Sequence, residues 1–144
     1  MVVQIVLGLI MTAITVGFGA FSIIAGAESI RRREYWLFGG ERFSRHIVAL
    51  IFVSTWLVIG MLFVIVLWAA LLVTLGIFPR FEPALYFSMI SFTTLGFGDV
   101  ILPIEWRLLS GFIAVDGFLL FGLNTAFIFE VLQRLRNAAG VSEV

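Results

Sequence analysis

The chain has 144 residues, of which 62% are hydrophobic and 12% are charged, with a mean hydropathy of +1.17. Soluble domains are roughly 45–50% apolar and about 25% charged, so this composition excludes an ordinary soluble protein and indicates a membrane protein. The net charge is zero and cysteine is absent, which excludes a disulfide framework and a thiolate metal site.

Three segments, residues 2–27, 47–78 and 106–132, are long and apolar enough to form transmembrane helices. Crossing about 30 Å of hydrocarbon takes about 20 helical residues. The first segment ends in Ala25-Gly26-Ala27, which resembles a signal-peptide cleavage site. It has no basic start, however, and its apolar run is too long for a signal peptide. We therefore expect residues 1–27 to be a retained transmembrane helix rather than a cleaved leader.

The linker of residues 28–46 is rich in arginine. It contains Arg31, Arg32, Arg33, Arg42 and Arg45, together with aromatic residues suited to a membrane interface. The positive-inside rule places this linker in the cytoplasm, and the N-terminus therefore outside. The third span then returns the chain to the cytoplasm, where Arg134, Arg136 and the short tail of residues 137–144 lie. This predicts a multi-pass protein of the plasma membrane.

A short helix is expected over residues 83–92, since Pro83 suits a first helical position and Glu82 suits the positive end of a helix. Such a helix is about 15 Å long, so it can enter the membrane but cannot cross it. The chain must then return as non-helical backbone. At membrane depth such backbone is tolerated only where protein buries it or where it lines a water-filled path.

Residues 93–99, TTLGFGD, provide such a lining. Glycine reaches left-handed dihedrals without steric cost, and Gly96 and Gly98 alternate as a run of carbonyls pointing one way requires. Leu95 and Phe97 would then turn away and brace the loop against the short helix. The carbonyls of Thr94, Leu95, Gly96 and Phe97, with the Thr94 hydroxyl, form a ladder of oxygens that can replace the water shell of an alkali cation.

This stretch resembles the filter of the potassium-channel pore-domain family, which reads T-V/I-G-Y/F-G-D. The likeness covers about residues 47–135. It implies a pore domain over residues 47–136 with an outer helix (47–78), a pore helix (83–92), a selectivity filter (93–99) and an inner helix (106–132). It further implies a homotetramer that coordinates K⁺ along the filter. One chain supplies only one wall of a pore, so the sequence independently requires several copies.

The chain departs from the family pattern around the filter. Leu95 replaces the usual valine or isoleucine, and Phe97 the commoner tyrosine. Ile90 stands where some members carry a glutamate that pairs with the aspartate at position 99. We therefore expect Asp99 to hold the outer filter through Tyr86 or backbone, with Thr93 also supporting the filter.

Several residues of the third span are candidates for the cavity or for gating. Gly117 and Gly122 match the spacing of the family's inner-helix glycines, and both a gating hinge and close helix packing fit them. Phe118, Phe121 and Thr125 form one helical stripe, which by family likeness faces the cavity and otherwise contacts the outer helix.

Asp116 and Asn124 are polar residues within the third span. A carboxylate at mid-span costs at least ~2.5 kcal/mol, so Asp116 should face protein or water. It could tune the cavity charge, or it could lie buried behind the filter against Ser91 or Thr93. For Asn124, an interhelical hydrogen bond is slightly favoured.

The favoured function is a passive potassium-selective ion channel. Its partners would be further copies of the chain, the lipid bilayer and monovalent cations, with no cofactor and no nucleic acid. The alternatives are a weakly selective monovalent cation channel and a non-conducting membrane subunit or scaffold. The sequence contains no hydrolase elbow and no zinc-protease motif, so we do not expect an enzyme. It does not identify the gating stimulus.

Overall fold

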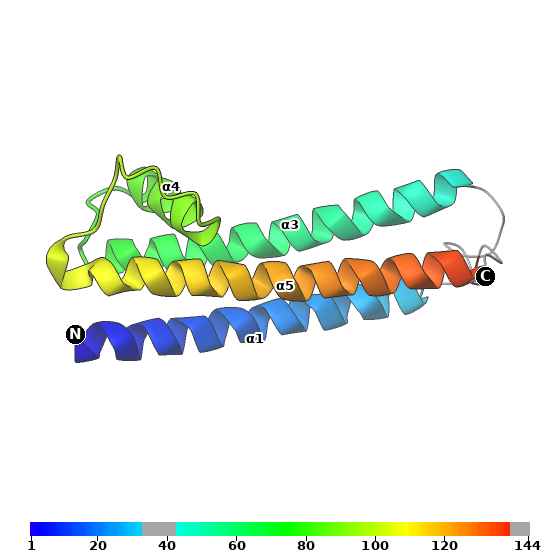
Figure 1. Cartoon of the computed structure of the whole chain (residues 1–144), viewed down its shortest axis with the longest axis horizontal. Helices are drawn as coiled ribbons and strands as arrows, with labels where there is room; N and C mark the ends of the chain where they lie inside the picture. The colour runs from blue at the N-terminus through cyan, green and yellow to red at the C-terminus, as the bar shows by residue number, and fades with distance from the viewer. Residues whose placement is uncertain (33–42, 139–144) are drawn as a thin grey trace.

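The computed structural model of the chain describes residues 1–32 and 43–138, and within these ranges it contains helices and no strand (Figure 1). In chain order the elements are α1 (Val2–Arg32), α3 (Phe43–Thr74), α4 (Phe81–Phe92), the 3-10 helix η1 (Ile104–Trp106) and α5 (Arg107–Ala138). Three segments are long and apolar enough to span a membrane: Val2–Ser29, His46–Thr74 and Ile104–Asn137. The expected all-α membrane protein is therefore confirmed.

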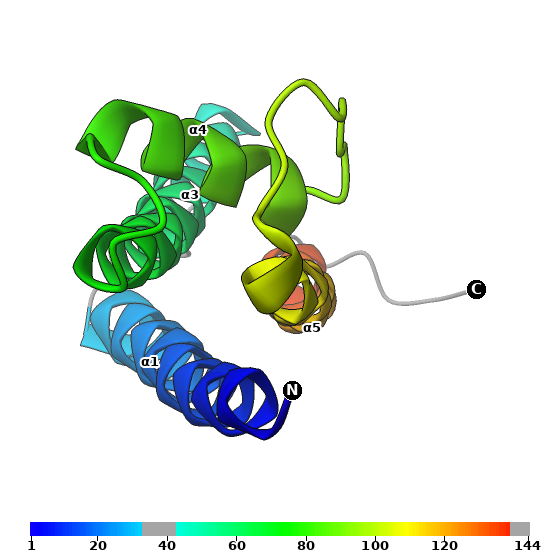
Figure 2. The ribbon, with the colours of Figure 1, turned by 90° about the vertical axis from the view of Figure 1, so that its left-hand side faces the viewer.

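The three long helices run side by side, with α3 antiparallel to α1 and α5 (Figure 1). Viewed along the bundle, they lie at the corners of a triangle, and α4 packs on α3 and α5 on the side opposite α1 (Figure 2). The N-terminus, the end of α3, α4 and the start of α5 therefore share one end of the molecule.

The end of α3 differs from the prediction. The helix ends at Thr74 and not at residue 78, because Gly76 adopts a positive φ of 71°. The Gly76 N–H donates to the Val73 carbonyl at 2.9 Å and the Ile77 N–H to the Leu72 carbonyl at 3.1 Å. This is a Schellman cap, which satisfies two of the carbonyls left free at a helix end.

The predicted linker and tail are helical where the structure describes them. α1 continues through Glu28 to Arg32, α3 already begins at Phe43, and α5 continues to Ala138. The helices continue through these polar residues. Within α1, Arg31 forms an ion pair of 2.9 Å with Glu28, which lies one turn earlier. The rest of the expected arginine-rich linker (residues 33–42) and of the expected tail (residues 139–144) lies outside the described residues.

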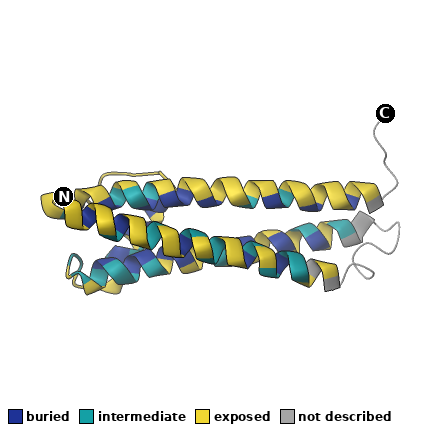
Figure 3. Ribbon diagram, turned by 90° about the horizontal axis from the view of Figure 1, so that it is seen from below, coloured by how far each residue is buried: buried dark blue, intermediate teal, exposed yellow. Residues whose placement is uncertain are grey.

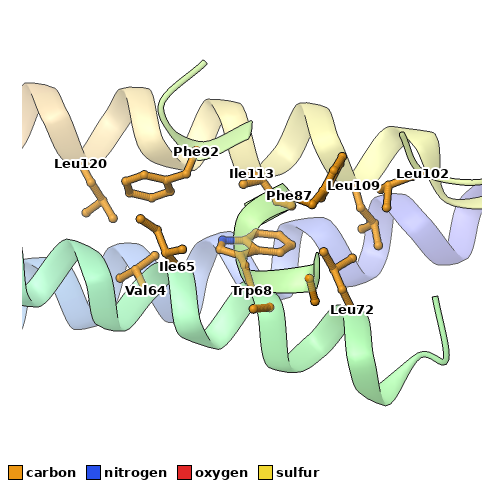
Figure 4. Close-up of a cluster of buried hydrophobic side chains, with 12 residues drawn as sticks. Val64, Ile65, Trp68, Leu72, Phe87, Phe92, Leu102, Leu109, Ile113 and Leu120 are labelled. Carbon is orange, nitrogen blue, oxygen red and sulfur yellow. The ribbon is translucent and has the colours of Figure 1, made fainter. Parts of the chain in front are cut away.

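Burial is concentrated in stripes along the long helices, and much of the remaining apolar surface is exposed, as a lipid surrounding allows (Figure 3). The larger buried cluster joins α3, α4 and α5 around Trp68, Phe92 and Ile113, each 0% exposed (Figure 4). A second cluster around Leu57, Phe127 and Val131 joins α3 and α5 nearer the other end. The first cluster fixes α4 to the bundle.

Small residues let α1 approach α5 closely. A Cβ at Gly8 would stand 2.3 Å from the Phe112 ring, and a Cβ at Gly19 would stand 2.3 Å from a Leu120 methyl. In addition, the Gln4 side-chain oxygen accepts a hydrogen bond of 3.1 Å from the Leu108 N–H in the first turn of α5. α1 is therefore packed into the same bundle as the rest of the chain.

Candidate functional site

The short helix α4 leads into the 93–99 loop. It has 12 residues and begins at Phe81, so Pro83 is its third residue and the predicted first helical position is wrong by two residues. At 1.5 Å per residue the helix is about 18 Å long, which is too short to cross a bilayer. Glu82 lies in its first turn, where the helix dipole favours a negative charge.

The loop folds back onto the end of α4 through backbone hydrogen bonds. The Thr94 N–H donates to the Ser91 carbonyl at 2.9 Å. The Leu95 and Gly96 N–H groups both donate to the Ile90 carbonyl, at 2.9 and 3.1 Å. The Thr93 hydroxyl donates to the Met89 carbonyl at 2.8 Å. These bonds hold Thr93 to the last turn of α4 and leave the loop carbonyls from Thr94 onward without a backbone partner among the described residues.

Alternate residues of the loop have positive φ angles: 58° at Thr94, 51° at Gly96 and 78° at Gly98. The left-handed backbone expected at both glycines is confirmed. Thr94 was not expected to share it, because a β-branched residue with positive φ is an outlier. Such alternation turns successive carbonyls toward one side, the arrangement by which main-chain oxygens coordinate a dehydrated cation.

Every residue of the 93–99 loop is exposed in the single chain. Leu95 is 57% exposed and Phe97 66% exposed, so the predicted bracing of these side chains against α4 is not made within one chain. The Thr94 hydroxyl makes no hydrogen bond to the described residues and is available to a ligand. The loop is thus shaped by its backbone and its junction with α4, with little side-chain packing.

Tyr86 and Asp99 connect α4 to the far end of the loop. The Tyr86 hydroxyl donates to a carboxylate oxygen of Asp99 at 2.7 Å, as the sequence led us to expect. This hydrogen bond raises the pKa of Tyr86 above its ordinary value of 10.0, because the ionised phenol would lose the bond and would face the Asp99 charge. Ile90 is buried and offers Asp99 no polar partner.

Gly117 packs against the end of α4. A Cβ at this position would lie 1.9 Å from the Phe92 carbonyl oxygen and 2.8 Å from its carbon. Close packing, one of the two roles considered for Gly117, is therefore observed. Gly122 differs, because a Cβ there would meet nothing within 4 Å.

The stripe of Phe118, Phe121 and Thr125 lies on the exposed side of α5. Phe118 is 75% exposed and Phe121 45% exposed, so the stripe is not buried against the outer helix α3. Phe121 reaches the end of α4, with its ring centroid 6.0 Å from that of Phe92. The Thr125 hydroxyl donates to the Phe121 carbonyl at 2.8 Å. This face is free for a cavity or another subunit.

Asp116 is 0% exposed and lies between three helices. One carboxylate oxygen accepts hydrogen bonds from the Thr15 hydroxyl of α1 and from the Trp68 indole N–H of α3, each at 2.7 Å. A role in tuning cavity charge directly is therefore wrong, because the chain's own helices enclose the carboxylate. It is buried as the alternative required, but against Thr15 and Trp68 rather than Ser91 or Thr93.

The sequence interpretation missed both partners of Asp116. The sequence did contain a signal for the contact with α1: small residues recur at helical spacing along one side of that helix, at Gly8, Thr15, Gly19 and Ser22.

Asn124 lines a small cavity with Gly19 and Ser22. Its amide makes no hydrogen bond to the described residues, so the expected interhelical bond is absent there. Across residues 1–32 and 43–138, no group of three metal-ligating His, Cys, Asp or Glu side chains occurs.

A family model described as "Ion channel" matches residues 51–134, more than half of the chain. The chain belongs to this ion-channel family. The match runs from α3 through α4 and the 93–99 loop into α5, and it leaves α1 outside its bounds. Membership confirms the family resemblance of the sequence. No curated protein and no solved structure gave a significant match to this channel chain.

Proposed function

We propose that the chain forms a passive, potassium-selective channel, as a homotetramer around a central pore. Each subunit contributes one 93–99 loop as selectivity filter and α4 as pore helix. The carbonyls of Thr94, Leu95, Gly96 and Phe97, with the Thr94 hydroxyl, replace the hydration shell of K⁺. Gly98 completes the filter, and no cofactor is needed.

The observation that carries this proposal is the positive φ at positions 94, 96 and 98. A non-glycine residue in this region costs of order 1–3 kcal/mol, and such strain is concentrated at functional sites. A scaffold has no use for a strained, exposed ladder of carbonyls. The conformation at Thr94 therefore favours a conducting role over a non-conducting one.

The electrostatics of α4 support a cation pathway. α4 ends at Phe92, directly before the filter, and its C-terminal end carries a partial negative charge. No basic residue lies in its last turn. Pore helices that converge below the filter would together favour a cation in the cavity, which the exposed stripe of Phe118, Phe121 and Thr125 would line.

Assembly is supported by what one chain leaves exposed. Leu95 and Phe97 lie 57% and 66% exposed next to the filter backbone, and neighbouring subunits would cover them. A closed ring of carbonyl ligands also needs several loops, whereas each chain provides one.

The test is ion flux from purified protein in liposomes, with K⁺ and Na⁺ compared and Ba²⁺ added as a blocker. We expect K⁺ flux well above Na⁺ flux, blocked by Ba²⁺, and absent from protein-free liposomes. Equal K⁺ and Na⁺ flux would replace the proposal with a weakly selective cation channel. No flux from intact tetramers would replace it with a non-conducting subunit.

We further propose a plasma-membrane location with the N-terminus outside and the 28–46 linker and C-terminus in the cytoplasm. The N-terminus and the filter share one end of the bundle (Figure 1), and Arg134 and Arg136 lie in the last turns of α5 at the other. Since the chain has no cysteine, Val2→Cys and Asn137→Cys each report one side. An impermeant thiol reagent outside intact cells should label only Val2→Cys.

A further inference from the structure

We propose that Asp116 is a positioning residue for conduction, through which α1 and α3 hold α5 where it supports the end of α4. This inference rests on the proposed function. It gives α1, which lies outside the family match, a defined part in the performance of the pore.

Asp116, Thr15 and Trp68 form a junction between three helices. Each of the three is 0% exposed. The Thr15 hydroxyl and the Trp68 indole N–H both reach the same carboxylate oxygen at 2.7 Å, while the other oxygen has no partner among the described residues. Each donor comes from a different helix, so one oxygen connects α1, α3 and α5.

A carboxylate is a costly way to hold helices together in a membrane, since burial at mid-span costs at least ~2.5 kcal/mol on insertion scales. Apolar residues of similar volume often stabilise a protein as well as a buried charge or better. Unlike an apolar contact, a hydrogen bond has a direction. The junction is therefore better suited to fixing the relative positions of the helices than to adding stability.

The next residue of α5 transmits this position to the filter. Gly117 lies against the backbone of Phe92, where a Cβ would stand 1.9 Å from the carbonyl oxygen. Phe92 is the last residue of α4 and is 0% exposed. Thr93 and Thr94 follow directly. A shift of α5 relative to α1 and α3 would press on the backbone from which the filter starts.

α1 is matched to α5 in register. Gly8 faces Phe112, Thr15 faces Asp116, and Gly19 faces Leu120. The three α5 positions are spaced by four residues and so share one face of the helix. Sliding α1 by one residue would remove the hydrogen bond and would drive side chains into both glycine contacts. The fit therefore sets where α1 holds Asp116 along the membrane normal.

The experiment compares Thr15→Val with Thr12→Val in the full chain, in liposomes. Both substitutions remove one hydroxyl from α1 and keep the side-chain shape. The Thr12 hydroxyl is buried without a hydrogen-bond partner, so its loss leaves the junction intact. Thr15→Ser keeps the donor and serves as the rescue. Trp68→Phe removes the second donor and provides an independent test.

We expect Thr15→Val and Trp68→Phe to form tetramers, with K⁺ flux per tetramer reduced about three- to tenfold, the size expected from the loss of one ordinary hydrogen bond. Thr12→Val and Thr15→Ser should conduct like the unmodified protein. In the double variant Thr15→Val with Asp116→Ala, the flux should equal that of Asp116→Ala alone, because Thr15 acts through Asp116.

Failure of this inference is distinguishable from failure of the proposed function. An unmodified protein that passes no K⁺ contradicts the proposed function, and the inference fails with it. If the unmodified protein conducts and Thr15→Val and Trp68→Phe conduct equally well, the positioning role alone is overturned. If both variants fail to assemble while Thr12→Val assembles, the junction is required for folding, which also overturns the positioning role.

Discussion

Phe92 and Thr93 are joined by one peptide bond, yet they belong to regions held in opposite ways. Phe92 is 0% exposed and lies in the buried cluster where α4 packs against α3 and α5. From Thr93 to Asp99 every residue is exposed, and the backbone takes positive φ at three alternate positions. This buried cluster depends on close packing within one chain. The 93–99 loop depends on backbone conformation, and in the proposed tetramer its surroundings come from other subunits.

The largest effect is expected where the loop depends on glycine. A Cβ at Gly96 meets no atom of its own chain within 4 Å, so within one chain the cost of Gly96→Ala comes from the φ of 51°. An alanine there costs roughly 1–2 kcal/mol, and the cost recurs in every subunit. We expect K⁺ flux to fall at least about a hundredfold. Gly111→Ala, which is helical and equally unobstructed, is the control. Normal flux through Gly96→Ala would show that the loop conformation is not needed for conduction.

The next effect concerns the contact of Gly117 with Phe92, where the space available limits the side chain and the backbone conformation does not. Gly117→Ala forces α5 and the end of α4 apart, because the Phe92 backbone stands 1.9 Å from the new Cβ. Overpacking of this kind costs about 1–3 kcal/mol, which thermal unfolding in detergent should register. Gly122→Ala meets nothing within 4 Å in its own chain, and because alanine is a better helix former than glycine, it should unfold at or slightly above the temperature of the unmodified protein. Equal stability of the two variants would contradict the packing role.

A smaller difference is expected along the α1 contact. A Cβ at Gly8 meets three atoms of the rigid Phe112 ring within 2.7 Å, whereas one at Gly19 meets a single Leu120 methyl carbon at 2.3 Å. A ring must move as a whole, but a methyl group can change rotamer. Gly8→Ala should therefore lower the unfolding temperature more than Gly19→Ala. The reverse order would mean that α1 is less tightly held near its start than we infer.

The smallest effect belongs to the exposed bond between Tyr86 and Asp99. Its loss in Tyr86→Phe should reduce flux only modestly, since neither partner is buried. The raised pKa means that the bond contributes fully below pH 10.0 and is lost as pH rises through the higher folded-state value. In a Tyr35→Phe background, near-ultraviolet absorbance should show Tyr86 ionising later than a free tyrosine. Ionisation at the ordinary pH would contradict the bond.

Much of the loop could be predicted because residue types dictate it. Gly96 and Gly98 are free to adopt the left-handed backbone, and Tyr86 was the polar side chain considered for Asp99. The positive φ of Thr94 could not be predicted, because threonine disfavours it and only the bonds to Ser91 and Ile90 explain the turn. The end of α3 could have been predicted, since Gly76 suits a helix C-cap and Pro79 follows shortly after.

The junction of Asp116 with Thr15 and Trp68 could not be predicted in the same way. Thr12 and Thr15 lie one turn apart in the same apolar helix, and nothing local distinguishes the one that meets Asp116. Which threonine does so depends on the register of α1 along α5, and that register is set by side-chain volumes at Gly8 and Gly19. Composition placed Asp116 against protein or water but could not name Trp68, which is 48 residues away in sequence.

The most direct test of the account is a structure of the assembled protein with Rb⁺ or Tl⁺ in place of K⁺, located by anomalous scattering. We predict a tetramer with ions on its axis, level with the carbonyls of Thr94, Leu95, Gly96 and Phe97. Loops that do not converge on an axis, or an axis without ions beside these carbonyls, would contradict the proposed filter.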